Sequence, residues 1–462
     1  MASLLLVLLA CSGTDTDLPP TPVPVDSDSD ADTDPDAPWS AADCAGLNPN
    51  SDYSSQLDTW DAHTDPADPH LGDLVLTGSS SIRRWEHAQR DLAAWGPIQR
   101  GFGGAWLRDV AGWADRLVLA HEPRAVVVYA GTNDLTDGAP PTDVLKSWRC
   151  LVHTVLEADP DTHVVFVPVT PNPARWGGWP TAEAFNADVE ALTSHPNLHY
   201  ADVATPFLAL GAPPPEHLFV SDQLHLSEDG YALWTPPILD ALAAIPPRDP
   251  PPFSAPAEPF YVRIDFGPTN PEDGAPAPDT DAFGNRWNAW HGNDGDAQIL
   301  AGDMLQGLLT TQGDETGIDA VVAGGFKTNG YANGGLTSPP AGLQTLAVPE
   351  ATGDFFWTGD ADDPGSVTLT GLDPARRWTV RLFAARDDAE VRVTRYTVTG
   401  ATTASVELQT SGPGAGSGNT NDGSVAVLTG LEPDPWGQLH IDVAIAQGAF
   451  AYLSLLELEA EL

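Results

Sequence analysis

The chain has 462 residues with a net charge of −45 at pH 7, and 42% of its residues are hydrophobic. This apolar content is enough for packed cores and excludes a chain that is disordered throughout. The negative charge excludes nucleic acid and anionic lipid as main partners, because both would be repelled. Since so long a chain exceeds what one hydrophobic core normally serves, we expect two domains plus connecting segments.

The N-terminal segment, residues 1–11, is an apolar run that is too short to span a bilayer as a helix. It resembles a secretory signal, and Leu8-Leu9-Ala10-Cys11 resembles the bacterial lipobox, in which the cysteine carries the lipid. The Lys or Arg that usually precedes such a run is missing. The resemblance implies an exported, membrane-anchored lipoprotein, periplasmic or at the cell surface, with Cys11 as the lipid attachment site. A buried N-terminal strand is the alternative.

Residues 12–39 consist mainly of Asp, Thr, Ser and Pro. Such a segment buries little apolar surface and its charges repel one another, so we expect a disordered tether. The alternating aspartates between Asp26 and Asp36 lack the glycine and glutamate spacing of an EF-hand, and we predict no metal site there.

Two cysteines, Cys44 and Cys150, remain if Cys11 is lipidated. Export places them in an oxidising compartment, where they could form a disulfide. Cys150 falls on a helix-like stretch, however, and free buried cysteine is common. The sequence favours neither the disulfide nor the two free cysteines.

The segment 40–245 alternates short apolar runs with helix-like stretches. The apolar runs are Leu74–Leu76, Ala125–Tyr129 and Val164–Val167, with weaker candidates at Pro97–Gln99 and Leu198–Val203. Helical periodicity marks residues 106–120 and 144–155. Continuous apolar strands alternating with helices predict a parallel sheet that is covered on both faces. The last helix should begin at Ser227 and kink or restart at Thr235, because two prolines follow.

The segment 246–258 is rich in proline and separates the two domains. From residue 259 to 462, short alternating segments between Gly, Asp, Asn and Pro clusters predict an all-β sandwich of jelly-roll type. Asp265-Phe266-Gly267 and the tryptophan-containing segment 284–290 loosely resemble galactose-binding-like or carbohydrate-binding modules. Exposed tryptophans would stack on sugars, whereas tryptophans in sandwiches are more often core, so glycan binding stays open.

Four short blocks of the first domain stand at predicted strand ends or helix starts. They are VLTGSSSIR at 75–83, QRGFGG at 99–104, VYAGTND at 128–134 and SDQLHL at 221–226. In this order they resemble the blocks of SGNH hydrolases, also called GDSL esterases, over roughly residues 70 to 245. The resemblance implies a flavodoxin-like three-layer α/β domain and hydrolysis of carboxylic esters by a serine.

The resemblance assigns three catalytic roles. Ser80 becomes the nucleophile, although Ser79 stands where the family more often has Asp. His225 becomes the base, for which imidazole is suited because its ordinary pKa lies near the operating pH. Asp222 becomes the group that orients the imidazole and stabilises its charged form. The short spacing lets both residues reach the site from one loop.

The resemblance also implies an oxyanion hole made by the backbone N–H groups of Ser80 and Gly104 and the side-chain amide of Asn133. Glycine lets the backbone approach a substrate without a Cβ in the way. An amide is a neutral donor that can stabilise negative charge without acting as a base. Such a set needs neither a metal ion nor an organic cofactor.

A loop after the fourth predicted strand contains Arg175, Trp176 and Trp179. It lies at the sheet edge where α/β proteins bind ligands. These side chains could line the acyl or alcohol pocket, or they could pack a long loop.

We therefore expect an anchored serine esterase that removes short acyl groups, acetyl first, from extracellular carbohydrate. The expected partners are this ester substrate and, through the lipid only, a membrane. The alternatives are a lysophospholipase or short-chain lipase, or an acyltransferase with the same triad. A rival of another class is a catalytically silent glycan-binding lipoprotein, which would not need the complete catalytic set. The sequence leaves the oligomeric state open.

Overall fold

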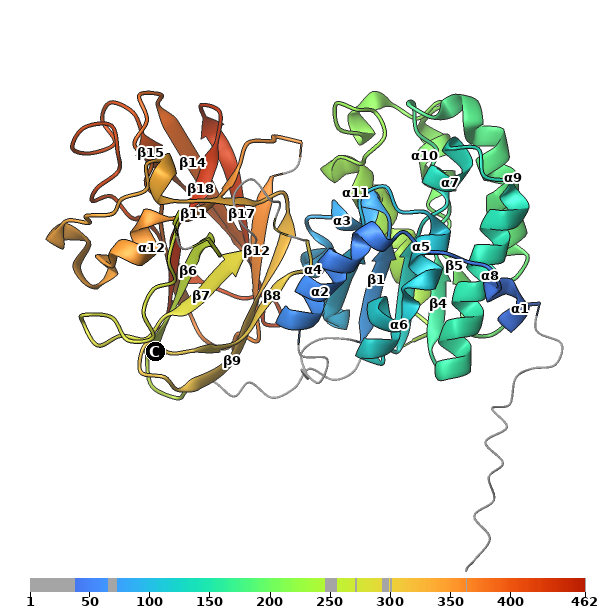
Figure 1. Ribbon diagram of the computed structural model, residues 1–462, viewed down its shortest axis with the longest axis horizontal. Coiled ribbons are helices and arrows are strands. Elements are labelled where there is room, and N and C mark those ends of the chain that lie inside the picture. The colour runs from blue at the N-terminus through green and yellow to red at the C-terminus, as the bar shows by residue number, and fades with distance from the viewer. Residues whose placement is uncertain are drawn as a thin grey trace, which may run out of the picture. The chain divides into compact units, whose positions relative to one another are not determined.

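A computed structural model of the chain describes residues 38–64, 73–245, 256–270, 272–292, 299, 301–362 and 364–461. The predicted signal with Cys11, the tether before residue 38 and most of the predicted linker lie outside these described residues. Residues Pro38–Leu462 form one compact unit, in which an α/β part precedes an all-β part (Figure 1). No helix of the described residues is both long and apolar enough to cross a bilayer.

The α/β part is built on a five-stranded parallel sheet in the order β2-β1-β3-β4-β5. Its strands are β1 (Leu74–Gly78), β2 (Pro97–Gly101), β3 (Ala125–Tyr129), β4 (His163–Phe166) and β5 (Leu198–Tyr200). Every residue of β1, β2 and β3 is buried, as strands covered on both faces require. The chain reverses its direction across the sheet between β1 and β3, which opens a crevice at the carboxyl ends of these two strands.

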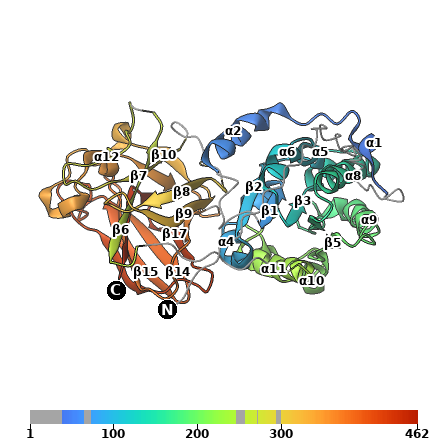
Figure 2. The same cartoon turned by 90° about the horizontal axis from the view of Figure 1, so that it is seen from below.

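Helices cover both faces of this sheet. They are α1 (Ala41–Cys44), α2 (Ser54–His63), α3 (Ser80–Arg83), α4 (Ala88–Asp91), α5 (Leu107–Gly112), α6 (Ala114–Leu117), α7 (Thr132–Thr136), α8 (Pro141–Ala158), α9 (Trp179–Glu190), α10 (Ala204–Leu210) and α11 (Glu228–Leu242). Figure 2 shows α5, α6 and α8 on one face of the sheet, and α4, α10 and α11 on the other. The predicted three-layer α/β arrangement is confirmed.

One helix prediction was wrong and another was met in part. The stretch 106–120 is not one helix, because α5 ends at Gly112 and α6 starts at Ala114. A Cβ on Gly112 would lie 2.6 Å from Pro49, so packing requires this helix-weakening glycine. Helix α11 begins after Ser227 as predicted, but it runs through its two prolines without restarting at Thr235. Its buried face, which includes Trp234, packs against the sheet. The stability gained by this packing exceeds the cost of the two backbone N–H donors that the prolines lack.

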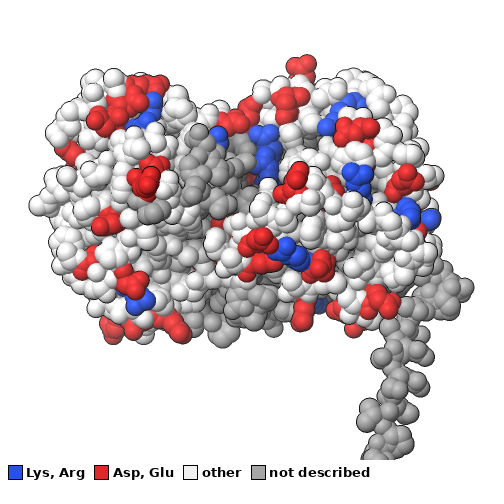
Figure 3. All heavy atoms as spheres, viewed as in Figure 1, with Lys and Arg blue, Asp and Glu red and all other residues white. Residues whose placement is uncertain are grey.

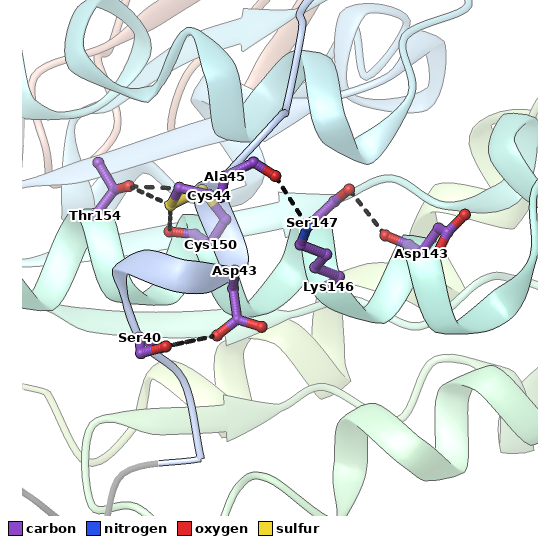
Figure 4. The surroundings of a disulfide bond; sticks show 9 residues. All are labelled: Ser40, Asp43, Cys44, Ala45, Asp143, Lys146, Ser147, Cys150 and Thr154. Carbon is purple, nitrogen blue, oxygen red and sulfur yellow. Dashed lines mark hydrogen bonds between the residues drawn. A yellow bond between two sulfur atoms is a disulfide. The ribbon is translucent and has the colours of Figure 1, made fainter.

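A disulfide ties α1 to α8. Cys44 and Cys150 are joined across 106 positions of sequence, with their Cα atoms 4.8 Å apart (Figure 4). Lys146 Nζ adds a hydrogen bond to the Ala45 carbonyl at 2.9 Å. Closing so long a loop restricts the unfolded chain, and native disulfides typically stabilise by about 2–4 kcal/mol. The bridge therefore holds the N-terminal end of the α/β part on its longest helix.

In the described residues of the all-β part there are three sheets and one short α-helix, α12 (Pro349–Gly353). The six-stranded sheet has the order β15-β14-β17-β12-β9-β8, with bounds Thr403–Ser411, Arg392–Thr399, Leu439–Gln447, Gly365–Thr370, Glu315–Gly324 and Met304–Leu309. The five-stranded sheet has the order β16-β13-β19-β6-β7, with bounds Ala426–Leu431, Trp378–Phe383, Leu455–Ala460, Phe260–Pro268 and Asn288–Gly292. The three-stranded sheet has the order β10-β11-β18, with bounds Lys327–Asn329, Phe355–Thr358 and Ala451–Leu453.

One hydrophobic core fills this sandwich and takes residues from both large sheets. The predicted all-β sandwich is confirmed. Trp287 and Trp290, from the segment that resembled a carbohydrate-binding module, are only 5% and 2% exposed. Both therefore belong to the interior and present no open face on which a sugar could stack.

Acidic side chains are scattered over the face of the molecule that Figure 3 shows, and basic ones are few. The whole chain has 65 Asp and Glu residues against 20 Lys and Arg residues. The acidity is therefore not confined to the N-terminal segment.

Candidate active site

The first element of the site is the turn that follows β1. Gly78 has a φ of +141°, and a Cβ there would lie 2.0 Å from the Tyr129 carbonyl oxygen of the neighbouring strand β3. Glycine is thus required at this position. The Ser79 N–H donates to the same carbonyl at 2.9 Å, and Ser80 then begins helix α3. This turn brings the half-buried Ser80 to the carboxyl end of the sheet.

Three predicted residues meet in a chain of hydrogen bonds. Ser80 Oγ lies 2.8 Å from His225 Nε2, although the two residues are 145 positions apart. His225 Nδ1 lies 2.5 Å from Asp222 Oδ2. Asp222 Oδ1 accepts the backbone N–H groups of Leu224 and His225 at 2.8 and 2.9 Å. A nucleophile, a base and a group that orients the base are therefore within hydrogen-bonding reach of one another.

The turn between Asp222 and His225 has an unusual backbone. Gln223 has a φ of 59°, in the left-handed region that residues other than glycine rarely adopt. Hydrogen bonds hold it on both sides: its N–H donates to Val220 and its carbonyl accepts from Ala174, at 2.9 and 3.1 Å. No local sequence pattern predicts this conformation, which places Asp222 beside His225 and His225 beside Ser80.

Charge in this turn favours a neutral imidazole beside a carboxylate. Burial lowers the pKa of His225, and the charges of Arg84 and Arg83 lower it further. Asp222 acts in the opposite direction, but the pKa of His225 stays below the ordinary histidine value. Burial acts to raise the pKa of Asp222, but hydrogen bonds from the His225 ring and from nearby backbone N–H groups bring it below the ordinary value. At neutral pH the histidine is therefore free to accept a proton.

Arg84 is a residue of this site that the sequence did not point to. Its Nη1 lies 3.2 Å from His225 Nδ1 and 3.9 Å from Asp222 Oδ2. Its Nη2 lies 3.8 Å from Asp360 Oδ2. Arg84 follows helix α3 and stands four positions after Ser80, a spacing that places two side chains on one side of a helical turn.

The predicted oxyanion donors Gly104 and Asn133 follow strands β2 and β3, at the carboxyl end of the sheet. Gly104 is exposed, has a φ of +75°, and would place a Cβ in open space, so its backbone is accessible to a ligand. Asn133, on α7, donates from Nδ2 to the Ala105 carbonyl at 3.0 Å, next to that glycine. Phe102 N–H donates to the Gly78 carbonyl at 2.9 Å, which ties the glycine turn to the nucleophile turn. Among the hydrogen bonds of the described residues, none joins Ser80 directly to Gly104 or Asn133.

Arg175 fixes the orientation of the Asn133 amide. Its Nη1 donates to Asn133 Oδ1 and to Thr132 Oγ1, both at 3.0 Å. The amide oxygen is thus engaged by the arginine, which turns the Nδ2 donor toward the glycine turn. The sequence suggested that Arg175 lines a pocket or packs its loop, and did not indicate its contact with Asn133.

Arg175 and Trp179 also line a cavity of about 80 Å³. The rings of Trp176 and Trp179 are nearly parallel, with centroids 6.3 Å apart. Thr132 and Asn172 contribute polar groups to the same wall. The loop therefore does both things that the sequence left open: it lines a cavity and packs on itself.

Asp134, next to Asn133, anchors α7 to the start of α5. Both of its carboxylate oxygens accept the Leu107 N–H, at 3.0 and 3.1 Å. Burial raises the pKa of Asp134 to about 7, although the bond from Leu107 lowers it. The carboxylate thereby holds in place the helix that carries Asn133.

Comparisons with known proteins bear on the α/β part. Residues 70–233 match the model of the GDSL-like Lipase/Acylhydrolase family. No curated protein matches the chain.

Solved structures resemble it at low identity. A GDSL-like lipase from Bacteroides thetaiotaomicron is 17% identical, with a TM-score of 0.36 over 44% of this chain and 98% of that one. A lipase/acylhydrolase from Enterococcus faecalis is 19% identical, with a TM-score of 0.33 over 38% and 98%. A catalytic mutant of an acetylxylan esterase from Geobacillus stearothermophilus is 16% identical, with a TM-score of 0.32 over 39% and 98%.

At these scores the solved structures say nothing about substrate, and the activity rests on the family match and the geometry of the site. The all-β part lies outside the matched residues. The α/β part of this chain is a GDSL-like lipase/acylhydrolase domain, and the protein is a serine hydrolase that acts on ester bonds.

Proposed function

We propose that Ser80, His225 and Asp222 are the catalytic residues of this esterase. The observation that carries the proposal is the unbroken chain of hydrogen bonds from Ser80 Oγ through the imidazole to Asp222. Ser80 Oγ attacks the ester carbonyl while His225 Nε2 takes its proton. The same proton passes to the leaving alcohol, and the acyl group stays on Ser80. Water, deprotonated by His225, then releases the acid.

The negative oxygen of the tetrahedral intermediate is assigned to the N–H groups of Ser80 and Gly104 and to Asn133 Nδ2. Two hydrogen bonds support this assignment. Asn133 Nδ2 donates to the carbonyl of Ala105, which follows Gly104, and Arg175 donates to Asn133 Oδ1. A donor that is held in place before the reaction costs no reorganisation when charge develops.

Replacing Asn133 by Ala should lower kcat by roughly 10²–10³-fold with little change in KM, since one oxyanion donor typically contributes about 3 kcal/mol to the transition state. Steady-state kinetics on p-nitrophenyl acetate measure this. Asn197→Ala is the matched control, because that amide also donates to a backbone carbonyl, of Pro160, but belongs to no part of the site. Equal losses in the two variants would remove Asn133 from the oxyanion hole.

Replacing Arg84 by Gln should move the acidic limb of kcat/KM to higher pH. The base must be neutral to accept a proton, so activity rises with pH through the pKa of His225. In the parent protein this limb should lie below about 6.5, the ordinary histidine pKa. Removing the positive charge of Arg84 raises the pKa of the imidazole and shifts the limb upward. Arg116→Gln, which breaks exposed ion pairs with Asp58 and Asp61, should leave it in place. An unmoved limb in Arg84→Gln contradicts this account.

The proposed substrate is a short acyl ester, acetyl first, on extracellular carbohydrate. A small cavity of about 80 Å³ is lined by Thr132 and by Arg175, the residue that holds the Asn133 amide, and we assign the acyl group of the substrate to it. The sugar portion rests on the expectation of export and on the two neighbouring tryptophans, whose rings suit stacking.

Export and a lipid anchor at Cys11 are part of the same proposal. The Cys44–Cys150 bridge supports it, because disulfides persist in oxidising compartments and are rare in the cytosol. Metabolic labelling with a radioactive fatty acid should mark the parent protein and leave Cys11→Ser unlabelled.

A single substrate panel tests the proposed specificity. The full-length protein is assayed on p-nitrophenyl esters of increasing acyl length, and on acetylated xylan with release of acetate measured. We expect the highest kcat/KM for acetate, a steep fall with chain length, and acetate release from the polymer. A preference for long acyl chains or for lysophospholipid would overturn the deacetylase assignment while leaving the triad in place.

A further inference from the structure

Three side chains of metal-binding type meet outside the catalytic triad. His87 lies between α3 and α4, and His440 and Asp442 lie on β17. One ligand atom of each lies within 4.8 Å of those of the other two. The Nε2 atoms of His87 and His440 are 3.2 and 3.0 Å from Asp442 Oδ1. Because His87 and Asp442 are 355 positions apart, this cluster is made by folding alone.

Strand β17 presents two of the ligands on one face. Leu439, Ile441 and Val443 pack into the core of the sandwich. Side chains alternate along a strand, so His440 and Asp442 project from the opposite face. Thr368 lies opposite His440 on the neighbouring strand β12, and its Oγ1 is 2.7 Å from His440 Nδ1.

His87 has a longer contact of the same kind. It stands at the N-cap of α4, seven positions after Ser80, and its Nδ1 lies 3.8 Å from a Glu228 carboxylate oxygen. Both imidazoles therefore have an oxygen on the Nδ1 side and turn Nε2 toward Asp442. Metal-ligating histidines commonly have this arrangement, in which an oxygen near the second nitrogen fixes the ring.

The spacing and chemistry fit a small divalent ion. Ligand atoms about 2.0–2.1 Å from a tetrahedral Zn²⁺ lie roughly 3.3–3.4 Å from one another. The two separations from Asp442 Oδ1, 3.2 and 3.0 Å, lie close to that value. The three ligand atoms as a set lie within 4.8 Å of one another, so the two imidazole nitrogens draw closer together when the ion binds. Two imidazoles and one carboxylate suit Zn²⁺ and its first-row neighbours. His87 and Asp442 also line a solvent-open cleft of about 780 Å³, which gives an ion a way in and a water room to be a fourth ligand.

We propose that His87, His440 and Asp442 bind one divalent transition-metal ion, for which Zn²⁺ is the best fit. The ion joins the segment that follows the nucleophile helix α3 to strand β17 of the sandwich. None of its ligands belongs to the triad, so its role is structural: binding to the folded chain alone stabilises that chain.

Zn²⁺ binding to the full-length protein tests the site. Protein stripped with a chelator is titrated with ZnCl₂ by calorimetry, and the bound metal is counted by elemental analysis after gel filtration. We expect one tightly bound ion per chain, an affinity at least about tenfold lower in His87→Gln and in Asp442→Asn, and a Tm that Zn²⁺ raises in the parent but not in these two variants. His153→Gln, a histidine of α8 outside the cluster, should behave as the parent.

Any weak Zn²⁺ binding by the acidic N-terminal segment is the same in every variant, so it does not affect the difference in affinity between the parent and a variant. Co²⁺ is a second probe, since its visible absorption in a tetrahedral site should appear in the parent and in His153→Gln but not in His87→Gln. Circular dichroism shows whether each variant is folded. No bound Zn²⁺, or equal affinity in the parent and both cluster variants, would overturn the proposal and leave a trio in which Asp442 accepts two imidazole N–H groups.

Discussion

Ser80→Ala should lower kcat for ester hydrolysis by roughly 10⁴–10⁶-fold, the range known for removing a serine nucleophile, while the protein stays folded. The change deletes the oxygen that lies 2.8 Å from His225 Nε2, and alanine offers no atom that can form the acyl intermediate. Steady-state kinetics on p-nitrophenyl acetate at neutral pH measure the loss, and the thermal midpoint reports the fold.

Ser79→Ala is the matched control for this experiment. Ser79 Oγ is buried without a hydrogen-bond partner among the described residues, so its removal should cost little. The double variant Ser80→Ala with His225→Ala should be no slower than Ser80→Ala alone, because residues that act as one unit are not additive. If Ser79→Ala lost activity and Ser80→Ala kept it, the nucleophile would have been assigned to the wrong serine.

Asp222→Asn should lower kcat by roughly 10³–10⁴-fold with KM little changed. An asparagine amide in place of Oδ2 can donate to His225 Nδ1, which favours the tautomer whose Nε2 already carries a proton. Such an imidazole cannot take the Ser80 proton. The Asp222 side chain is 42% exposed, so solvent tempers the effect and we expect the lower end of the range.

The same kinetic assay measures the Asp222 variant. Asp229→Asn, in the first turn of α11, is its control because it changes one exposed carboxylate of the neighbouring helix. The parent and Asp229→Asn should agree within about twofold, a difference of less than half a kcal/mol in the barrier. Activity of Asp222→Asn within about tenfold of the parent would mean that the carboxylate does not orient the base.

The parallel sheet could be predicted from the pattern of apolar runs, whereas the roles of the triad residues came from the resemblance to SGNH hydrolases. Strands buried on both faces read as continuous apolar runs, and their carboxyl ends locate the side chains that follow them. Ser80 follows β1 and Asn133 follows β3, at the reversal of strand order. Asp222 and His225 are near in sequence, so their proximity needed no knowledge of the fold.

Other features depend on tertiary contacts that leave no local pattern. The packing of Trp234 keeps α11 continuous through two prolines, whose local effect predicted a kink or a restart. Arg84 reads as an ordinary basic residue after a short helix, and only the fold brings it to His225. The cluster of His87 with two β17 residues joins parts of the chain that no spacing rule connects.

Mass spectrometry after labelling with a fluorophosphonate tests the central claim most directly, because this reagent bonds covalently to an activated serine. The account predicts one label per chain, located by fragmentation on Ser80 and not on Ser79 or Ser81, with loss of esterase activity in step with labelling. His225→Ala should label far more slowly. An active protein that takes its label on another residue, or that takes none, would contradict the assignment of Ser80 as the nucleophile.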